Sequence, residues 1–353
     1  MTHILISMLG LWFLFLILRS MTRIALINRH YRDFFAEMTG RVVYTSVSLR
    51  LRGNRDTIAV HSTLLWVFPG YLLCLILVYF VGAMFAFALL YWGTGAANTW
   101  HQSLLASGSA LNTLGFAVPA TIAGQWLAIP EGALGLGIVV FLFTFIPGYQ
   151  AVIRAREDKT SWLYVRTGDR PTGVALLGWC QRAGIARNMR DVWESWEDWF
   201  RMLGVTHSVL PMLSMWPSAQ NNQSWVLAAA AVLDAATLAV SSMNTEDAES
   251  ARICVRTGTR ALLAIADALG PTCKVNRQAT ISTSKEWYEA ARAHLYSTGL
   301  PLRTAVDADP EWREFSSLRR QYEGALFFVA LQTFSTQESI SMTTHEKVLL
   351  QTR

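Results

Sequence analysis

The residues of this chain best suited to chemistry form a short uncharged stretch, Thr113-Leu114-Gly115-Phe116-Ala117. It contains no acid, base or nucleophile, so its backbone carbonyls are the groups that can act. Successive carbonyl oxygens can replace the water shell of a cation if the backbone alternates between ordinary and left-handed conformations. Gly115 adopts the left-handed conformation at low cost, and the Thr113 hydroxyl adds an acceptor at the inner end. The stretch predicts a carbonyl-lined cation site.

The composition places this stretch in a membrane protein. The 353 residues are 52% hydrophobic and only 16% charged, whereas an ordinary globular chain carries about 25% charged residues. Between Asp56 and Arg154 the only Asp, Glu, Lys or Arg residue is Glu131, and charges recur throughout the region after Arg154. The first part of the chain is therefore expected in lipid and the remainder in water.

Three apolar runs are predicted to cross the membrane: Ile4–Leu18, Leu64–Trp92 and Gly132–Ile153. Arginines are frequent between the first two runs, and Arg154, Arg156 and Lys159 follow the third. By the positive-inside rule both regions are cytoplasmic. Both ends of the region from Leu64 to Ile153 then lie in the cytoplasm, and its two spans account for one crossing outward and one crossing back. The segment between Gly93 and Glu131 must therefore enter the membrane from outside and return to the outside.

A re-entrant loop of this kind is tolerated only where protein buries it or where it lines a water-filled cavity. Asn98–Leu111 is predicted to be its short descending helix, with Thr99 or Asn98 as the N-cap. The carbonyls at the end of that helix would direct partial negative charge into the cavity, which favours a cation.

The residues Thr113 to Ala117 resemble the filter of potassium channels, whose TVGYG form is well known, and the helix, loop, helix order resembles the two-helix pore module. Ala117 replaces the second glycine of that filter, and no acid follows it. If that position needs a positive φ, alanine costs on the order of 1–2 kcal/mol there. We therefore predict that Ala117→Gly sharpens potassium selectivity.

The resemblance extends over residues 64–238. The segments EGALGLGIVVFLFTFIPGYQAVIRARE, LYVRTGDRPTGVALL and NNQSWVLAAAAVLDAATL are similar, in this order, to bacterial potassium channel family proteins. The resemblance implies an all-α membrane protein of the bacterial inner membrane, assembled as a homotetramer. The expected parts are an N-terminal membrane helix with a basic cytoplasmic linker (1–62), a pore module of outer helix, re-entrant pore loop and inner helix (63–155), and a cytoplasmic α-helical domain (156–353).

Two features beside the loop have alternative interpretations. Glu131 either attracts cations in an outer vestibule or caps the helix that follows Pro130. The other feature is a set of helix-bending residues, which either form the hinge and gate of the inner helix or are simply common in membrane helices; they are Gly135, Gly137, Pro147 and Gly148.

The soluble part is predicted to be helical. Trp193, Trp196, Trp199 and Phe200 recur at helical spacing and serve either core packing or docking on the membrane surface. Residues 225–243 are apolar enough to be a fourth span, but the central Asp234 favours a buried helix. Asp234 would then bond a neighbouring cap or an arginine such as Arg252 or Arg256.

Other function classes have little support. The four cysteines, Cys74, Cys180, Cys254 and Cys273, have no metal-ligand spacing and are expected to be buried, reduced thiols. No catalytic or nucleotide-binding motif occurs, so neither an enzyme nor a cofactor is expected. The net charge of +5 is explained by arginines that can bind anionic lipid, without nucleic acid. Two hypotheses remain: a potassium-conducting cation channel, or a non-conducting membrane-anchored sensor or scaffold with a degenerate pore module.

Overall fold

The computed structural model describes residues 2–26, 33–51, 57–220, 222–244, 246–270, 283–303 and 309–333. Every regular element in these ranges is helical, apart from one isolated bridge between Met243 and Leu302. Four helices are long and apolar enough to cross a membrane: residues 2–24, 58–93, 122–167 and 225–242. The predicted all-α class and the presence of several membrane-length helices are thus confirmed.

The chain divides into two units, each with its own internal contacts. Unit 1 comprises residues 1–52 and 66–151, and unit 2 comprises 53–65 and 152–353. The division falls close to the predicted boundary at residue 155, but it places the N-terminal helix in the same unit as the predicted pore module.

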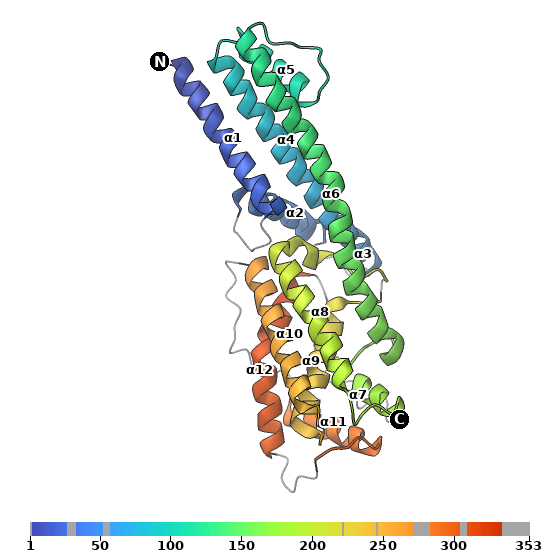
Figure 1. Ribbon diagram of the computed structural model, residues 1–353. Helices are drawn as coiled ribbons and strands as arrows, with labels where there is room; N and C mark the ends of the chain where they lie inside the picture. The colour runs from blue at the N-terminus through green and yellow to red at the C-terminus, as the bar shows by residue number, and fades with distance from the viewer. Residues whose placement is uncertain are drawn as a thin grey trace. The chain divides into compact units, whose positions relative to one another are not determined.

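Unit 1 contains α1 (Thr2–Leu26), α2 (Phe34–Leu51), α4 (Val67–Gly93), α5 (Trp100–Leu111) and the first part of α6 (Ile122–Thr167). The helices α1 and α4 lie side by side (Figure 1). A Cβ atom on Gly10 would lie 2.9 Å from the Ala86 carbonyl oxygen, and one on Gly93 would lie 2.7 Å from the Ser7 amide nitrogen. The later residue of α1 is thus beside the earlier residue of α4, so the two helices run antiparallel. Small residues let two helices approach closely, and the van der Waals packing that results is a source of attraction between helices in lipid.

A polar cluster joins the other end of α1 to α4 and to the start of α2. Ser20 Oγ donates to Asp33 Oδ1 at 2.7 Å and lies 2.8 Å from the Tyr79 hydroxyl. Asp33 in turn accepts from the Ala36 amide at 3.1 Å, which satisfies one of the unpaired N–H groups at the start of α2. The three polar side chains are buried, so each has a partner where an unpaired group would be costly.

Two predicted spans begin or end differently from the sequence expectation. The outer helix is divided into α3 (Thr57–Leu65) and α4 by a turn at Trp66. The inner helix was expected to begin at Gly132, but α6 begins at Ile122 and includes both Pro130 and Pro147. Proline is tolerated within membrane helices because neighbouring groups can satisfy the freed carbonyls.

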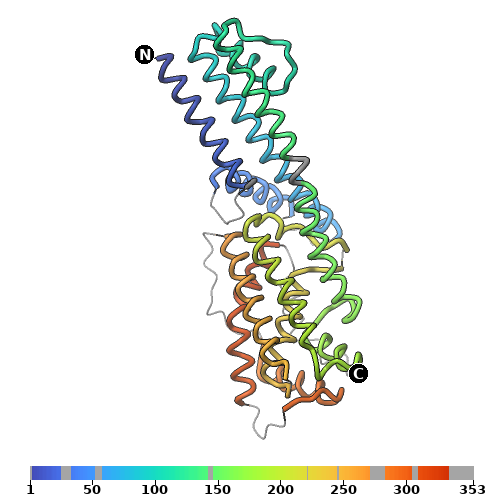
Figure 2. Tube along the Cα trace, in the orientation of Figure 1, coloured from blue at the N-terminus to red at the C-terminus, as the bar shows by residue number. Residues whose placement is uncertain are grey.

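Unit 2 contains α3, the end of α6, α7 (Gly173–Arg182), α8 (Arg190–Val209), η1 (Pro211–Met215), α9 (Trp225–Ser242), α10 (Ala248–Leu269), α11 (Lys285–Ser297) and α12 (Asp309–Gln332). In helix α9, 94% of the residues are buried, and the helix packs against α7, α10 and α12 (Figure 2). The expectation of a buried helix over 225–243 is thus met, although α9 is also apolar enough to span a membrane.

The tryptophan face of α8 belongs to the same core. Trp193, Trp196, Trp199 and Phe200 are all buried in it. The Trp196 and Trp199 rings are arranged edge to face, with 5.1 Å between the ring centroids. The core-packing prediction is therefore confirmed, and the alternative of docking on a membrane surface is wrong for these side chains.

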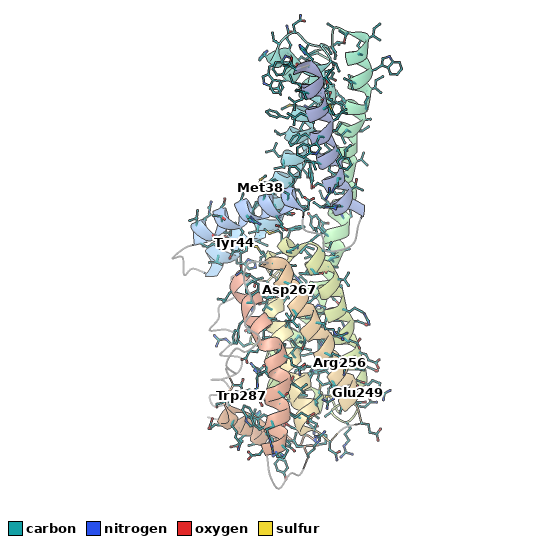
Figure 3. All side chains as sticks on the ribbon, turned by 90° about the vertical axis from the view of Figure 1, so that its left-hand side faces the viewer. Met38, Tyr44, Glu249, Arg256, Asp267 and Trp287 are labelled. Atoms are coloured by element: carbon teal, nitrogen blue, oxygen red, sulfur yellow. The ribbon has the colours of Figure 1, made fainter. Side chains whose placement is uncertain are left out.

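Asp234, in the middle of α9, is paired with an arginine, as predicted, but with neither Arg252 nor Arg256. It accepts hydrogen bonds from the Arg319 guanidinium and, at 2.7 Å, from the Tyr322 hydroxyl, both on α12. Arg252 instead pairs with Glu314 at 2.8 Å, and Arg256 is exposed on α10 (Figure 3). The prediction of an arginine partner is confirmed, but the two arginines named for it are wrong, because α12 approaches Asp234 from far along the chain.

Candidate functional site

The loop that carries the predicted cation site follows α5. Thr99 begins this helix, since its side-chain oxygen accepts from the Gln102 amide at 3.2 Å; the predicted N-cap at Thr99 is confirmed. Helix α5 packs against α4, where Ser107 Oγ donates to the Met84 carbonyl at 2.8 Å. The small residues of α5 allow the helix to lie close to α4, and this packing positions the end of α5, where the loop starts.

Helix α5 ends in a left-handed turn at Thr113. The Thr113 amide donates to the Ala110 carbonyl at 2.9 Å, and the Leu114 amide donates to the Ser109 carbonyl at 2.8 Å. This pair of bonds is the Schellman arrangement, in which the first residue after the helix cap is usually glycine. Thr113 has φ +56°, and it is the only non-glycine residue with positive φ in the described part of the chain. A β-branched residue in this conformation is strained.

Gly115 has φ +72°, and a Cβ atom added there would meet no other atom within 4 Å. Thr113 and Gly115 are thus both left-handed, while Leu114 between them is not. Ala117 is also outside the positive-φ region, so alanine is not strained at the position where the potassium-channel filter has its second glycine.

The sequence analysis did not identify Ser109, although it holds this loop. Its carbonyl accepts from Leu114, and its hydroxyl accepts from the Ala117 amide at 3.0 Å. The side chain is buried. The one signal in the sequence for this role was the presence of a serine inside a short helix. Serine is otherwise unfavourable in a helix, because its hydroxyl competes with the helical hydrogen bonds for backbone groups.

The apolar side chains of the loop are uncovered in the single chain. Leu114 is 65% exposed and Phe116 is 66% exposed. Val118 at the end of the loop, and Ile122 and Trp126 in the first turns of α6, are exposed as well. Exposed apolar side chains in this number indicate contact with another protein or with lipid.

Glu131 lies neither in an open vestibule nor at a helix cap. It is inside α6 and 0% exposed. One carboxylate oxygen accepts from the Tyr91 hydroxyl at 2.6 Å, and the other accepts from Ser107 Oγ. Glu131 therefore ties α4, α5 and α6 together, and it cannot attract ions at a surface from this position.

The four predicted hinge residues have different surroundings. A Cβ atom on Gly135 would overlap the Leu111 carbonyl group, so this glycine allows α6 to pack on the end of α5. A Cβ atom added to Gly137 or to Gly148 would meet no other atom within 4 Å, and Pro147 lies within the helix. Gly135 has a packing explanation, while a hinge at Gly137, Pro147 and Gly148 stays a prediction.

Within the described ranges, no group of three or more histidine, cysteine or acidic side chains could hold a metal ion. Cys180 and Cys254 are buried thiols, and burial raises the pKa of Cys180 to about 12. Cys74 is an exposed thiol, contrary to the expectation of burial, and Cys273 lies outside the described residues.

The fold and the site define a class: a helical protein with several membrane-length helices and an uncharged, partly left-handed loop between two of them. Comparison of the chain with protein-family models, with curated proteins and with solved structures found no match.

Proposed function

We propose that this chain is one subunit of a cation channel of the cell membrane, and that residues Thr113 to Ala117 line its ion path. The observation that supports this most directly is the conformation of the loop. Positive φ at Thr113 and Gly115, with Leu114 between them outside that region, is the kind of alternation that lets neighbouring carbonyls face one axis.

The strain at Thr113 supports a functional role. A left-handed threonine costs on the order of 1–2 kcal/mol relative to the ordinary conformation, and glycine would adopt this conformation without that cost. The loop nevertheless keeps this shape through the bonds that Ser109 makes to Leu114 and Ala117. Strained residues held in place by their surroundings are concentrated at functional sites, and threonine offers a hydroxyl oxygen that glycine lacks.

The proposal includes an oligomer. A loop from one chain cannot surround an ion, and the exposed Leu114 and Phe116 need a cover that further subunits would provide. The resemblance to potassium channels favours four subunits and potassium as the permeant ion. In this arrangement the loop faces the outside, unit 2 is cytoplasmic, and the basic residues near the cytoplasmic face bind anionic lipid.

Potassium efflux from liposomes that contain the purified protein tests this proposal. Gly115→Val is expected to abolish efflux, because a β-branched residue resists the positive φ of +72° at this position. Gly184→Val is the matched control, since Gly184 has a φ of +74° and open surroundings but lies in unit 2. Equal loss in both variants, or normal efflux in Gly115→Val, would contradict the assignment of the loop. No efflux from the wild type would favour the scaffold hypothesis.

A further inference from the structure

Unit 2 contains a cavity of about 620 Å³, and no residue of the loop over 113–117 lines it. Its walls are the end of α6, the loop over 168–172, one face of α7 and the end of α11. Small-molecule sites in proteins commonly have volumes of about 300–1,000 Å³. The cavity is therefore large enough for a small organic ligand.

The sequence of α7 explains why this space is open. Val174, Gly178 and Arg182 recur at intervals of four, so they share the helix face that lines the cavity. A Cβ atom on Gly178 would meet only the Arg182 guanidinium, at 3.5 Å. The neighbouring helix is held at a fixed distance, because Gln181 Nε2 donates to the Gly299 carbonyl at 3.0 Å. Figures 1 and 2 both show α7 and α11 side by side.

The charged lining of the cavity is mainly basic. Arg170, Arg182 and His294 line it together with a single acid, Asp169. Asp169 Oδ1 already accepts a hydrogen bond from Asn222 Nδ2 at 3.1 Å. Among the residues that the structure describes, neither arginine has a carboxylate within ion-pair distance. The lining thus presents more cationic donors than it can neutralise itself.

Three other arginines of unit 2 that are shielded from solvent have acidic partners. Arg319 pairs with Asp234, Arg156 pairs with Glu157 at 2.8 Å, and Arg292 pairs with Glu311 at 2.9 Å. Such pairing is expected, because a shielded charge without a partner is costly. Arg170 and Arg182 are exposed enough to remain hydrated, yet both face the same cavity. They are available to a ligand that enters it.

We propose that this cavity binds a small anion that carries one or more phosphate groups. The planar guanidinium group donates two parallel hydrogen bonds to phosphate oxygens, and two arginines can hold two phosphate groups or both sides of one. Thr172 and Thr298 add hydroxyl groups to the lining, and His294 adds a ring nitrogen. This inference does not depend on ion conduction by the loop over 113–117.

Calorimetric titration of the full-length protein in detergent with pyrophosphate tests the proposal. We expect saturable binding to the wild type, and about tenfold or greater weakening in Arg170→Gln and in Arg182→Gln, because each removes charge-assisted hydrogen bonds. Gly178→Leu changes no charge, and it should abolish binding by filling the cavity. Arg187→Gln is the matched control, since Arg187 is an exposed arginine of the same unit outside the lining.

Two results would overturn the proposal. One is the absence of saturable pyrophosphate binding to the wild type at millimolar concentration. The other is equal weakening by Arg187→Gln and by the two cavity substitutions, which would mean that only the general positive charge attracts the anion. Elution volume and helical content identify any variant that fails to fold, and the two arginine substitutions decide the outcome if Gly178→Leu is lost in this way.

Discussion

The hydroxyl of Tyr91 on α4 donates a hydrogen bond of 2.6 Å to the carboxylate of Glu131 on α6. Both side chains are buried, so this bond is made in surroundings where an unpaired polar group is costly. The other carboxylate oxygen is bonded to Ser107 of α5. The three helices around the candidate loop are thus joined at one acidic side chain.

Removing the Tyr91 hydroxyl should destabilise the protein. In Tyr91→Phe the Glu131 carboxyl loses one of its two donors, which costs about 1–3 kcal/mol. Thermal unfolding in detergent should therefore show a lower midpoint for Tyr91→Phe and an unchanged midpoint for Tyr296→Phe, because Tyr296 is exposed in unit 2. Equal midpoints for the two variants would contradict the stabilising role of this bond.

Close packing of α1 on α4 should depend on Gly93. A methyl group there would overlap Ser7 Oγ and lie 2.7 Å from the Ser7 amide nitrogen, so Gly93→Ala should separate the helices and cost about 1–3 kcal/mol. Gly70 on the same helix has open surroundings. Gly70→Ala should be neutral or stabilising by up to about 1 kcal/mol. The same thermal measurement compares the two, and a tolerated Gly93→Ala would rule out this helix contact.

In unit 2, Arg319 should matter far more than its neighbour Arg320. Arg319 is buried against Asp234 and lies 3.7 Å from the buried Glu323. Arg319→Met leaves both acids without their cation and should cost about 3–5 kcal/mol. The exposed Arg320 provides the control, and Arg320→Met should change the unfolding midpoint little. Similar midpoints for the two variants would show that this ion pair does not stabilise the core.

The stability of unit 2 should fall in mild acid because of His207. Burial, and then the nearby Arg156 charge, lower the pKa of His207 well below its ordinary value. Well above about pH 6.5 the ring is neutral in both the folded and the unfolded chain and contributes no pH dependence. As the pH falls further the unfolded chain takes up a proton that the folded chain does not, so stability decreases by up to about 1.4 kcal/mol per pH unit.

Unfolding midpoints measured between about pH 7 and pH 5 check this expectation. His207→Gln should flatten the pH dependence of the midpoint, and His101→Gln, at an exposed position of unit 1, should leave it unchanged. A wild-type midpoint that does not fall in this range would show that His207 is not kept neutral by the fold.

Local sequence signals predicted much of the fold. The region between Asp56 and Arg154, in which Glu131 is the one Asp, Glu, Lys or Arg residue, indicated where membrane-length helices lie, and Thr99 marked the start of α5. Each of these depends on neighbours along the chain. For the same reason, the spacing of the tryptophans in α8 predicted that they share one helix face, and the structure decided that this face packs in the core.

Contacts between distant residues could not be predicted in this way. Asp234 binds Arg319, Glu131 binds Tyr91, and Gly135 contacts the Leu111 carbonyl. A glycine that permits close packing and a glycine that permits bending have the same appearance in one sequence. The position of α12 or α5 in space decides between such alternatives, and periodicity carries no information about it.

Current recording across planar bilayers tests the central claim most directly. With the purified wild-type protein in potassium chloride, discrete current steps carried by potassium are expected, and Gly115→Val should show none while Gly184→Val retains them. Wild-type bilayers without current steps, or steps that persist in Gly115→Val, would contradict the proposal that residues 113–117 line an ion path.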